Sequence, residues 1–507
     1  MSQNLQSLNL VAPAFRGLNT QDSPLSLDPS FAIVADNSII DRRGRIAARK
    51  GSATVTTNKT ALGTDYINAI GEYRDDLGNS KLFSVGNNKI LSGTTTLVDE
   101  TPSCYTISDN NLKIVNFNSN LYFFQRGYEP LVYNQTLGAV TPMSTVQHAT
   151  GVASTMYGGE VLGAFGRLWT ADFIGDKSTI YWSDLLLGNH WSGGSSGSID
   201  ISKVWPNGYD EIVALAAHNG FLIIFGRDSI VVYEGAESPA SMTLSDTIEG
   251  IGCVDRYTVQ NLGTDLLFMS KEGLRSIQRT IQEKSLPLSD LSKNIRNDII
   301  TNITEETEEL RSVFSPENSF YLITFSSQQL TYCFDLRGTL ENGAYRVTRW
   351  PSNGFKSYFR DDDGTLYIGS TDGISTYSGY NDGTNTYQFV YQSPALSFGD
   401  TARLKILKKL RPTFVEGSGY TVNVKWSFDF GEAFRTAFVR LASQIPAYFN
   451  VGEFTAAEFT TGSLISEPTV NATGDGTTVN VALQTEINGQ PLSVQEFNVL
   501  TLIGKTI

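Results

Sequence analysis

A strand-turn-strand unit that recurs seven times restricts the fold of this chain more than any other feature of the sequence. Each unit is an apolar run, a turn of polar residues and glycine, and a second apolar run that begins 8 to 12 residues after the first. The first runs begin 39, 47, 53, 45, 54 and 46 residues apart, at Leu82, Leu121, Leu168, Phe221, Leu266, Phe320 and Leu366. A period of about 40–50 residues with several short strands is typical of β-propellers, in which four-stranded blades surround an axis. We therefore predict an all-β fold with a propeller of six or seven blades.

The fourth unit, "AHNGFLIIFGRDSIVVYEG", shows why its strands suit a blade. Five apolar residues, Phe221 to Phe225, stand in succession between Asn219-Gly220 and a second turn. Successive side chains of a strand point to opposite faces, so this strand is apolar on both. In a propeller the neighbouring blades cover both faces. Stacked β-sandwiches remain the alternative, but they would expose one face of most strands and predict alternation of apolar and polar residues.

That alternation is found in the last quarter of the chain. In "YTVNVKWSFDF", residues 420–430, apolar and polar residues alternate strictly, as expected of a strand with one solvated face. We predict an antiparallel, sandwich-like β-domain at 385–507, the propeller at 56–384, and an N-terminal arm at 1–55. The arm has too little patterned apolar surface to form a domain, so we expect it to dock on the propeller or on a neighbouring subunit.

Helix is predicted in only one place, the segment "PLSDLSKNIRNDIITNI" at 287–303. Ser289 is suited to cap such a helix, and Leu291, Ile295 and Ile299 fall on one stripe. We interpret the segment as an insertion at about 285–310 that projects from the propeller. Its apolar stripe makes it a candidate docking helix, to be covered by its own chain or by a neighbour.

Composition excludes several classes of protein. The net charge of −14 argues against binding of nucleic acid by bulk charge and against an anionic membrane surface. The first residues lack the pattern of a signal peptide and no apolar run has the length of a membrane span, so we expect synthesis in the cytoplasm and no membrane insertion. Cys104, Cys253 and Cys333 are too few and too scattered for a disulfide framework or a zinc site, and we expect them in the core.

The sequence offers little that predicts catalysis, metal binding or a cofactor. Gly193 to Gly197 match G-x-S-x-G, but Ser195 lies in a Gly/Ser loop and not on the strained elbow that the chemistry needs. The chain has three histidines, without metal-ligand spacing. The run Asp361 to Gly364 passes directly into a strand and is interpreted as a hairpin turn, not a calcium loop. We predict no cofactor, no metal and no enzyme activity.

Two basic clusters stand out against the acidic background. The first, in "DRRGRIAARKG", contains Arg42, Arg43, Arg45, Arg49 and Lys50. The second contains Arg403, Lys405, Lys409 and Arg411, whose odd positions would share one face of a strand. These residues are either solvated or paired with acidic neighbours, or they are candidate contacts to another subunit, to an adaptor ring or to DNA.

Four segments, taken in order, resemble the tail nozzle proteins of short-tailed bacteriophages, also called tail tubular protein B or packaged-DNA stabilisation proteins. The first is residues 17–51, with Gly17-Leu18-Asn19, Asn37, Gly44 and Arg49-Lys50-Gly51. The others are "IYWSD" at 180–184, "EGIGCVDRYTVQNLGTDLLFMSKEGLRSI" at 249–277 and "LPLSDLSKNI" at 286–295. The resemblance covers the arm and most of the propeller, and it is loose in the C-terminal domain.

The resemblance implies a structural virion protein of the tail, made in the bacterial host. Six copies would form a homohexameric tube below the portal and adaptor rings, in contact with tail fibre or spike proteins. Double-stranded DNA would be retained by the tube and would pass through it without tight binding. We expect the free chain to be monomeric and to form the ring only on the adaptor-portal assembly. A propeller glycosidase or sialidase and a receptor-binding tail protein remain as alternatives.

Overall fold

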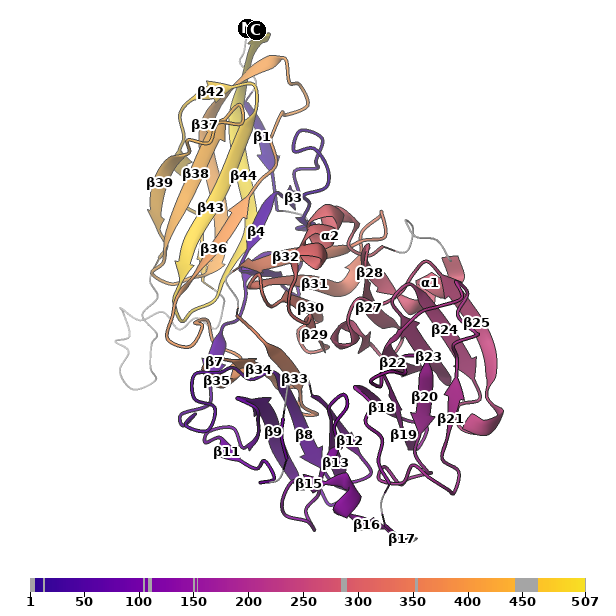
Figure 1. The fold of residues 1–507 in the computed structure, drawn as a ribbon. Helices are drawn as coiled ribbons and strands as arrows, with labels where there is room; N and C mark the ends of the chain where they lie inside the picture. Colours follow the sequence, from indigo (N-terminus) through magenta and orange to yellow (C-terminus); the bar gives the residue numbers. More distant parts are fainter. Residues whose placement is uncertain are drawn as a thin grey trace.

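The computed structural model describes residues 5–11, 14–103, 105–107, 112–148, 151–152, 154–283, 290–351, 354–442 and 464–506. Strands make up 49% of the structure and helices 6%. A ring of β-sheets forms one region, and two packed sheets form an elongated second region that carries both chain ends at its tip (Figure 1). The predicted all-β fold with a propeller is confirmed.

Six four-stranded blades form most of the ring, and each is antiparallel and runs from an inner to an outer strand. Blade 1 contains β8 (Ala69–Arg74), β9 (Ser80–Gly86), β10 (Lys89–Ser92) and β11 (Val98–Asp99). Blade 2 contains β12 (Lys113–Phe117), β13 (Asn120–Phe124), β14 (Leu131–Tyr133) and β15 (Thr141–Pro142). Blade 3 contains β18 (Glu160–Ala164), β19 (Arg167–Ala171), β20 (Thr179–Trp182) and β21 (Gly197–Asp200). The 3₁₀ turn η1 (Met143–Thr145) and the hairpin β16 (Gln147–His148) and β17 (Gly151–Val152) connect blades 2 and 3.

The remaining blades complete the ring. Blade 4 contains β22 (Ile212–His218), β23 (Phe221–Gly226), β24 (Ser229–Glu234) and β25 (Thr243–Glu249), with η2 (Pro239–Ser241) before the last strand. Blade 5 contains β29 (Arg311–Ser315), β30 (Phe320–Phe325), β31 (Leu330–Thr339) and β32 (Tyr345–Pro351). Blade 6 contains β33 (Ser357–Arg360), β34 (Leu366–Ser370), β35 (Gly373–Tyr377) and, from the N-terminal arm, β7 (Ser52–Thr54). Because β7 is the outer strand of the last blade and leads directly to the first, the arm closes the ring.

A three-stranded sheet stands between blades 4 and 5, where the fifth repeat was found. It contains β26 (Gln260–Asn261), β27 (Leu266–Ser270) and β28 (Gly273–Ser276), and η3 (Arg256–Thr258) precedes it. The innermost strands β22 and β29 both contact η3. The seven repeats therefore correspond to six four-stranded blades and this smaller sheet, and each repeat begins in the second strand of its sheet.

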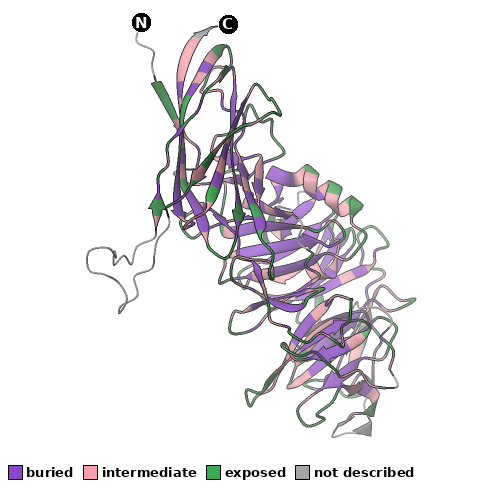
Figure 2. Ribbon diagram, turned by 90° about the vertical axis from the view of Figure 1, so that its left-hand side faces the viewer, coloured by how far each residue is buried: buried purple, intermediate pink, exposed green. Residues whose placement is uncertain are grey.

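The apolar strand β23 is buried on both faces, as its sequence requires. Leu222 and Ile224 belong to the core between blades 3 and 4, whereas Ile223 and Phe225 belong to the core between blade 4 and the three-stranded sheet. Alternate residues of one strand thus fill two different cores. Figure 2 shows the same distribution across the ring, with buried strands and exposed turns.

The C-terminal region is a sandwich of two sheets. One contains β37 (Arg403–Glu416), β44 (Leu492–Thr506), β40 (Ile465–Ser466), β41 (Val470–Asn471), β42 (Asp475–Gly476) and, from the arm, β1 (Leu5–Asn9), β5 (Ser38–Ile40) and β6 (Ile46–Ala48). The other contains β36 (Tyr387–Gln392), β43 (Val479–Ile487), β38 (Thr421–Phe428), β39 (Arg435–Arg440) and the arm strand β4 (Val34–Asp36). The short parallel pair β2 (Gly17–Leu18) and β3 (Phe31–Ala32) lies in the same arm.

One sheet joins the two regions. Strand β4 pairs with β36 of the sandwich on one side and with β32 of blade 5 on the other, so nine strands form a single sheet. The contact with β32 is a parallel bridge between Asp36 and Arg349, whose side chains also form an ion pair of 2.8 Å. The arm therefore contributes strands to both regions. The predicted domain boundaries stay predictions.

The helical insertion follows the three-stranded sheet. It contains α1 (Ile277–Glu283), η4 (Lys293–Ile295) and α2 (Arg296–Glu305). The predicted cap Ser289 lies outside the described residues, and the regular helix begins at Arg296, later than predicted. Cys253 and Cys333 are buried in the core as expected, and Cys104 lies outside the described residues.

Candidate functional site

The predicted docking helix is covered by its own chain. Leu291, Ile295 and Ile299 are fully buried in the large core that also contains sandwich and blade 5 residues. The arm packs over the same segment, where the backbone N–H groups of Thr20 and Gln21 donate to the carbonyl of Asn294. The stripe is therefore part of the core and does not present a surface to a neighbour.

The predicted basic face of β37 is interrupted. Arg403, Lys409 and Arg411 are exposed, but Lys405 is fully buried and its Nζ donates to the carbonyl of Asp400. The reason is that β37 pairs with β44 through register shifts. One shift lies between Arg403 and Lys405, and another lies between Leu407 and Lys409. Each bulge inserts a residue and changes which side chains face inward. The prediction of one basic face is wrong for Lys405, and burial lowers the pKa of its ammonium group.

Arg42, Arg43 and Arg45 of the first basic cluster lie in the turn between β5 and β6. Arg43 is exposed, Arg42 contacts the carbonyl of Glu317 at 3.5 Å, and Arg45 pairs with Asp41 at 2.6 Å. Both basic clusters belong to the same sheet, but β44 lies between β6 and β37. The structure does not bring the two clusters together.

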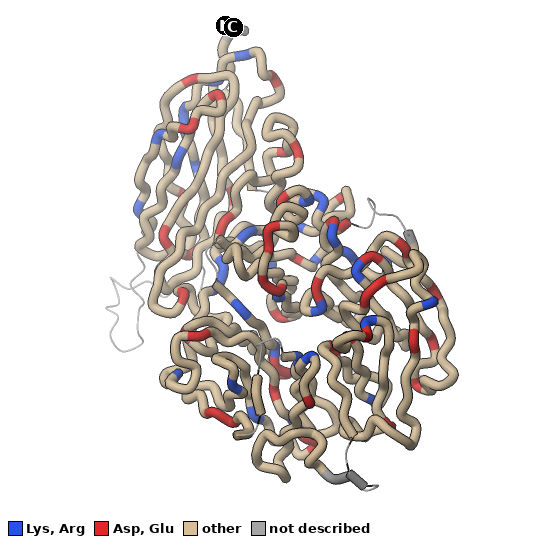
Figure 3. Tube along the Cα trace, in the orientation of Figure 1, with Lys and Arg blue, Asp and Glu red and all other residues tan. Residues whose placement is uncertain are grey.

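A charge cluster that sequence reasoning missed lies where the innermost strands begin. Glu160, fully buried at the start of β18, accepts hydrogen bonds from Lys113 Nζ at the start of β12 and from the backbone N–H of Leu215 in β22. Arg256 of η3 donates to the carbonyl of Gly159. These contacts join blades 2, 3 and 4 to η3 around the axis. Figure 3 shows basic and acidic segments along this inner edge of the ring.

Tyr257 extends this cluster across the axis. Its hydroxyl donates to the carbonyl of Leu112 beside β12, at 3.2 Å, although η3 stands on the opposite side of the ring. The Arg311 guanidinium of β29 lies 3.9 Å from the centre of the Tyr257 ring, and it pairs with Glu309 at 2.8 Å. The tyrosine is thus a brace between opposite sides of the propeller.

Asp255 is the acid of this cluster whose pKa is changed most by its surroundings. Burial, followed by the neighbouring Glu309 carboxylate, raises the pKa of Asp255 to about 6, against the opposing effect of Arg311. Its carboxylate accepts from the backbone N–H groups of Tyr257 and Leu310, at 2.9 and 3.0 Å. Acids and arginines on the axis are what a propeller glycosidase would need. Here the acids and arginines form ion pairs and hydrogen bonds with one another and with the backbone that connect the innermost strands. We call this cluster the axial brace.

In the described part of the chain, the Gly/Ser loop is hydrogen-bonded to the carboxylate of Asp184 and not to a histidine. Ser195 Oγ donates to Asp184 Oδ1 at 2.6 Å, and His190 Nδ1 lies 3.3 Å from Asp184 Oδ2. In a catalytic triad the histidine stands between the serine and the acid, whereas here the carboxylate stands between the other two. Hydrogen bonds from Ser195 lower the pKa of Asp184 far below its usual range, which makes its carboxylate a weaker base.

The segment at 17–51 forms the joint between propeller and sandwich. Arg49, 1% exposed, makes two hydrogen bonds to Asp382, at 2.6 and 2.9 Å, and one to Asn37 Oδ1 at 3.0 Å. Its guanidinium lies 4.1 Å from the centre of the Tyr387 ring. Asn37 has a φ of 51° and donates to the carbonyl of Gln388 in β36 at 2.8 Å. We call these four residues, Arg49, Asn37, Asp382 and Tyr387, the Arg49 clamp.

Glycines of this segment stand where a side chain would not fit. Gly17 has a φ of 91°, and a Cβ would lie 2.8 Å from the backbone nitrogen of Val347 in β32. A Cβ on Gly51 would collide with the carbonyl of Asn381, beside the clamp. Both positions bring the arm backbone against the body of the protein, so the motif residues serve the architecture of the joint.

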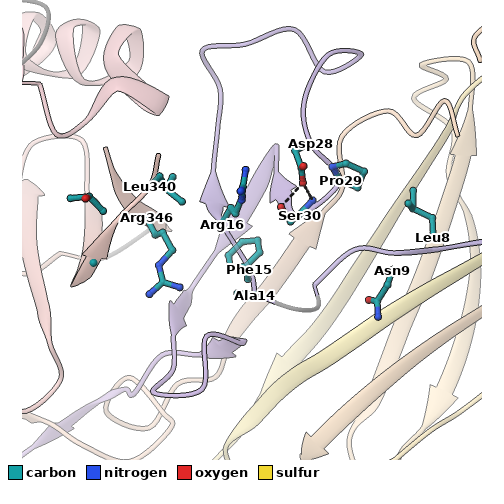
Figure 4. Close-up of a pocket in the computed structure, with 12 residues that line it drawn as sticks. Leu8, Asn9, Ala14, Phe15, Arg16, Asp28, Pro29, Ser30, Leu340 and Arg346 are labelled. Carbon is teal, nitrogen blue, oxygen red and sulfur yellow. Dashed lines mark hydrogen bonds between the residues drawn. The ribbon is translucent and has the colours of Figure 1, made fainter. Parts of the chain in front are cut away.

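A cavity of about 620 Å³ lies between the arm and the β31–β32 hairpin. Figure 4 shows Arg16 and Arg346 on its wall, with Asp28 tied to Ser30. Arg346 pairs with Asp335, and Arg16 lies 3.5 Å from the exposed Glu341. The lining mixes apolar and paired polar groups and indicates no particular ligand.

Within the described ranges, His, Cys, Asp and Glu side chains form no group of three or more that could hold a metal ion. In the same part of the chain, the helices are too short or too polar to cross a membrane.

No protein-family profile and no curated protein sequence matches the chain. Among solved structures, the extracellular domain of a one-component system from B. thetaiotaomicron matches with a TM-score of 0.40 and 10% identity over 78% of this chain; the chain spans 46% of that protein's length. The WD40 propeller domain of Doa1 has a TM-score of 0.37 and 12% identity, with 64% of this chain and 96% of that one covered. Streptogramin B lyase has a TM-score of 0.37 and 13% identity, with 63% and 94% covered. At these values the likenesses say nothing about function.

Proposed function

We propose that the chain is a structural subunit of a short-tailed phage tail, a nozzle protein that forms a homohexameric tube below the portal and adaptor rings. The tube retains packaged DNA and conducts it during ejection, and the protein is not an enzyme. The proposal starts from the four nozzle-like segments of the sequence. Its strongest support is the place of two of these segments in the fold, where they connect separate parts of the molecule.

Two of these segments build mechanical parts of the molecule. Residues 17–51 supply Asn37 and Arg49 of the Arg49 clamp and the strand β4 that joins propeller and sandwich. Residues 249–277 supply Asp255, Arg256 and Tyr257 of the axial brace. A tube wall that resists the pressure of packaged DNA needs rigid joints, and both parts are such joints.

Charge supports the same proposal. Six copies would carry a net charge of −84, six times −14. An acidic protein gives phosphate no bulk electrostatic attraction, so DNA passes without being held along its length. Retention of DNA would then depend on a closed gate and on contacts with the adaptor, and not on tight binding.

The glycosidase alternative is kept for a specific test, because acids and arginines do meet on the axis. Purified full-length protein should release no reducing sugar from host surface polysaccharide, and Asp255→Asn should not alter this result. Release of sugar that depends on Asp255 would overturn the non-enzymatic proposal.

The main test is the composition and assembly of virions. We expect mass spectrometry of purified particles to detect the protein, at six copies per particle. The purified chain should be monomeric by light scattering at micromolar concentration. A protein absent from purified virions would contradict the proposal.

A further inference from the structure

The strand order within a blade assigns each turn of the propeller to one of two faces. Because strands alternate in direction, the turns after the first and third strands lie at one face, and those after the second and fourth lie at the other. Of the exposed large apolar side chains in the described residues, eight lie in such turns of the first three blades or in the connection to blade 4. They divide evenly between the two faces.

Leucines occupy the first of these faces. The leucine surface consists of Leu77, Leu137, Leu185 and Leu186, which are 83%, 36%, 52% and 55% exposed. The turn between β12 and β13 connects the turns that carry these leucines. The Asn118 amide of this turn donates to the carbonyl of Leu186 in blade 3 at 2.8 Å, and the Asn134 amide, before Leu137, donates to Asn120 Oδ1 at 2.7 Å. The N–H of Asp76, beside Leu77, donates to Ser119 Oγ at 3.3 Å. The leucines therefore belong to a continuous part of this face.

Tyrosines occupy the opposite face of the same blades. The tyrosine surface consists of Tyr128, Tyr157, Ile174 and Tyr209, which are 39%, 45%, 73% and 69% exposed. The Ile174 side chain lies against Gly127, and the N–H of Gly127 donates to the carbonyl of Tyr157 at 2.9 Å. The loop that contains Tyr209 is joined to the turn that contains Ile174. The N–H of Ile212 donates to the carbonyl of Lys177 at 2.9 Å.

Charges differ between the two surfaces. Near the leucine surface, Asp76 is exposed and the side chain of Asp362 is 72% exposed. Near the tyrosine surface, the guanidinium groups of Arg126 and Arg227 are 48% and 58% exposed, whereas their acidic partners Asp172 and Glu211 are less exposed, at 6% and 33%. The turn of Arg227 also carries Asp228, which is 56% exposed and paired with the similarly exposed Lys271. The face with the leucine surface therefore presents carboxylates to solvent, whereas the face with the tyrosine surface presents guanidinium groups beside this ion pair.

We propose that the leucine surface of one copy docks on the tyrosine surface of the next copy. Scattered single apolar side chains are normal, but contiguous groups mark interaction sites, and tyrosine and arginine are enriched in them. Two different, complementary surfaces on opposite faces of one subunit give head-to-tail contacts, which close into a ring when the rotation permits. Leucines then pack against tyrosine rings, and the carboxylates face the guanidinium groups. This inference rests on the proposed ring and names the surfaces that would build it.

Cross-linking in assembled tails tests the contact directly. A photoreactive amino acid replaces Leu186 in the full-length protein, tails are isolated and irradiated, and cross-linked peptides are identified by mass spectrometry. Tails assembled from a mixture of isotope-labelled and unlabelled copies distinguish cross-links between two copies from cross-links within one copy. We expect cross-links to peptides with Tyr128, Ile174 or Tyr209 of another copy. The same probe at Leu244, exposed on β25 and outside both surfaces, should give no such cross-link.

Substitution gives an independent readout. Leu186→Asp should reduce incorporation into tails by at least about tenfold, the effect of 1.4 kcal/mol, while Leu244→Asp should not. Unfolding of both isolated variants should match that of the unaltered chain, since both side chains are exposed. Cross-links to a different tail protein, or normal incorporation of Leu186→Asp, would overturn the inference even in sixfold tails. A protein absent from virions would instead contradict the proposed function, and the cross-link would then be sought in the purified chain at high concentration.

Discussion

The propeller and the sandwich bury their strands in opposite ways. In β23 of the propeller, Ile223 and Ile224 point to opposite faces and are both buried, each in a different core. In β38 of the sandwich, Val422 is buried and its neighbour Thr421 is exposed. The difference arises because each blade has a neighbour on both sides, whereas each sandwich sheet has one. The pattern of apolar residues therefore reports how many layers cover a strand.

The two regions also share one segment, although their cores differ. Residues 5–54 supply the outer strand of blade 6 and four strands of the sandwich, one of which, β4, also bridges β32 and β36. Neither region has its complete set of strands without this arm. The comparison predicts that a substitution at the joint destabilises both regions, whereas a substitution within a strand destabilises only the core that the side chain fills.

The largest effect is expected at the Arg49 clamp. Arg49→Ala leaves the Asp382 carboxylate without its guanidinium partner and removes the contact with Tyr387, so we expect a loss of about 3–5 kcal/mol in the free energy of unfolding. Urea unfolding followed by tryptophan fluorescence measures it. Arg43→Ala, an exposed arginine six residues earlier, should change stability by less than about 0.5 kcal/mol. Equal effects of the two changes would show that the clamp is not a joint.

Strand substitutions test the layer comparison itself. Ile223→Ala and Ile224→Ala should each cost about 3 kcal/mol, because each opens a cavity in a separate core. In β38, Val422→Ala should cost about 2 kcal/mol, and the adjacent Thr421→Ala should remain within about 0.5 kcal/mol. Denaturant unfolding of the four variants checks the pattern. A large loss of stability for only one of the two isoleucine variants, or equal losses for Val422→Ala and Thr421→Ala, would contradict the comparison.

The axial brace predicts a pH effect that is specific to the propeller. The pKa of Asp255 is raised to about 6 in the folded protein, from an ordinary value of 3.8, so the folded state binds more protons between these values. Stability from this group is present at low pH and is lost as pH rises through about 4 to 6. The stability difference between the unaltered protein and Asp255→Asn should therefore shift by about 1–3 kcal/mol between pH 4.5 and 7.5. A difference that does not change with pH would contradict this account of Asp255.

The smallest effect is expected at the Gly/Ser loop. Ser195→Ala removes one hydrogen bond to Asp184 at a site that is accessible to solvent, which should cost no more than about 1 kcal/mol. Infectivity should not change. A serine-reactive probe that labels Ser195 in the native protein would show that the serine is activated after all.

The sequence predicted local features well and long-range ones poorly. The seven repeats, the double-sided strand at Phe221 to Phe225 and the alternating strand at 420–430 depend on adjacent residues. The first two are confirmed. The alternation is confirmed from Thr421 to Trp426 in β38, but Ser427 is buried and Phe430, beyond the strand, is exposed. The bulges that bury Lys405 depend on pairing with β44, about one hundred residues away. No local pattern indicates such a shift.

The candidate sites follow the same division. Asp255, Arg256 and Tyr257 stand together in the sequence, but their partners Leu112, Gly159 and Glu309 precede the first strands of three other sheets, so no local pattern reveals the axial brace. Arg49 was noted as part of a basic cluster and a motif. Its pairing with Asp382 required a fold that brings residues 333 positions apart into contact.

The rotational symmetry of the assembled tail, seen by electron microscopy with this protein located by a bound antibody fragment, tests the central claim most directly. We predict a sixfold ring of this protein directly below the portal and adaptor, around the path of the DNA. A threefold particle at the tail tip would contradict the nozzle proposal and favour a receptor-binding protein.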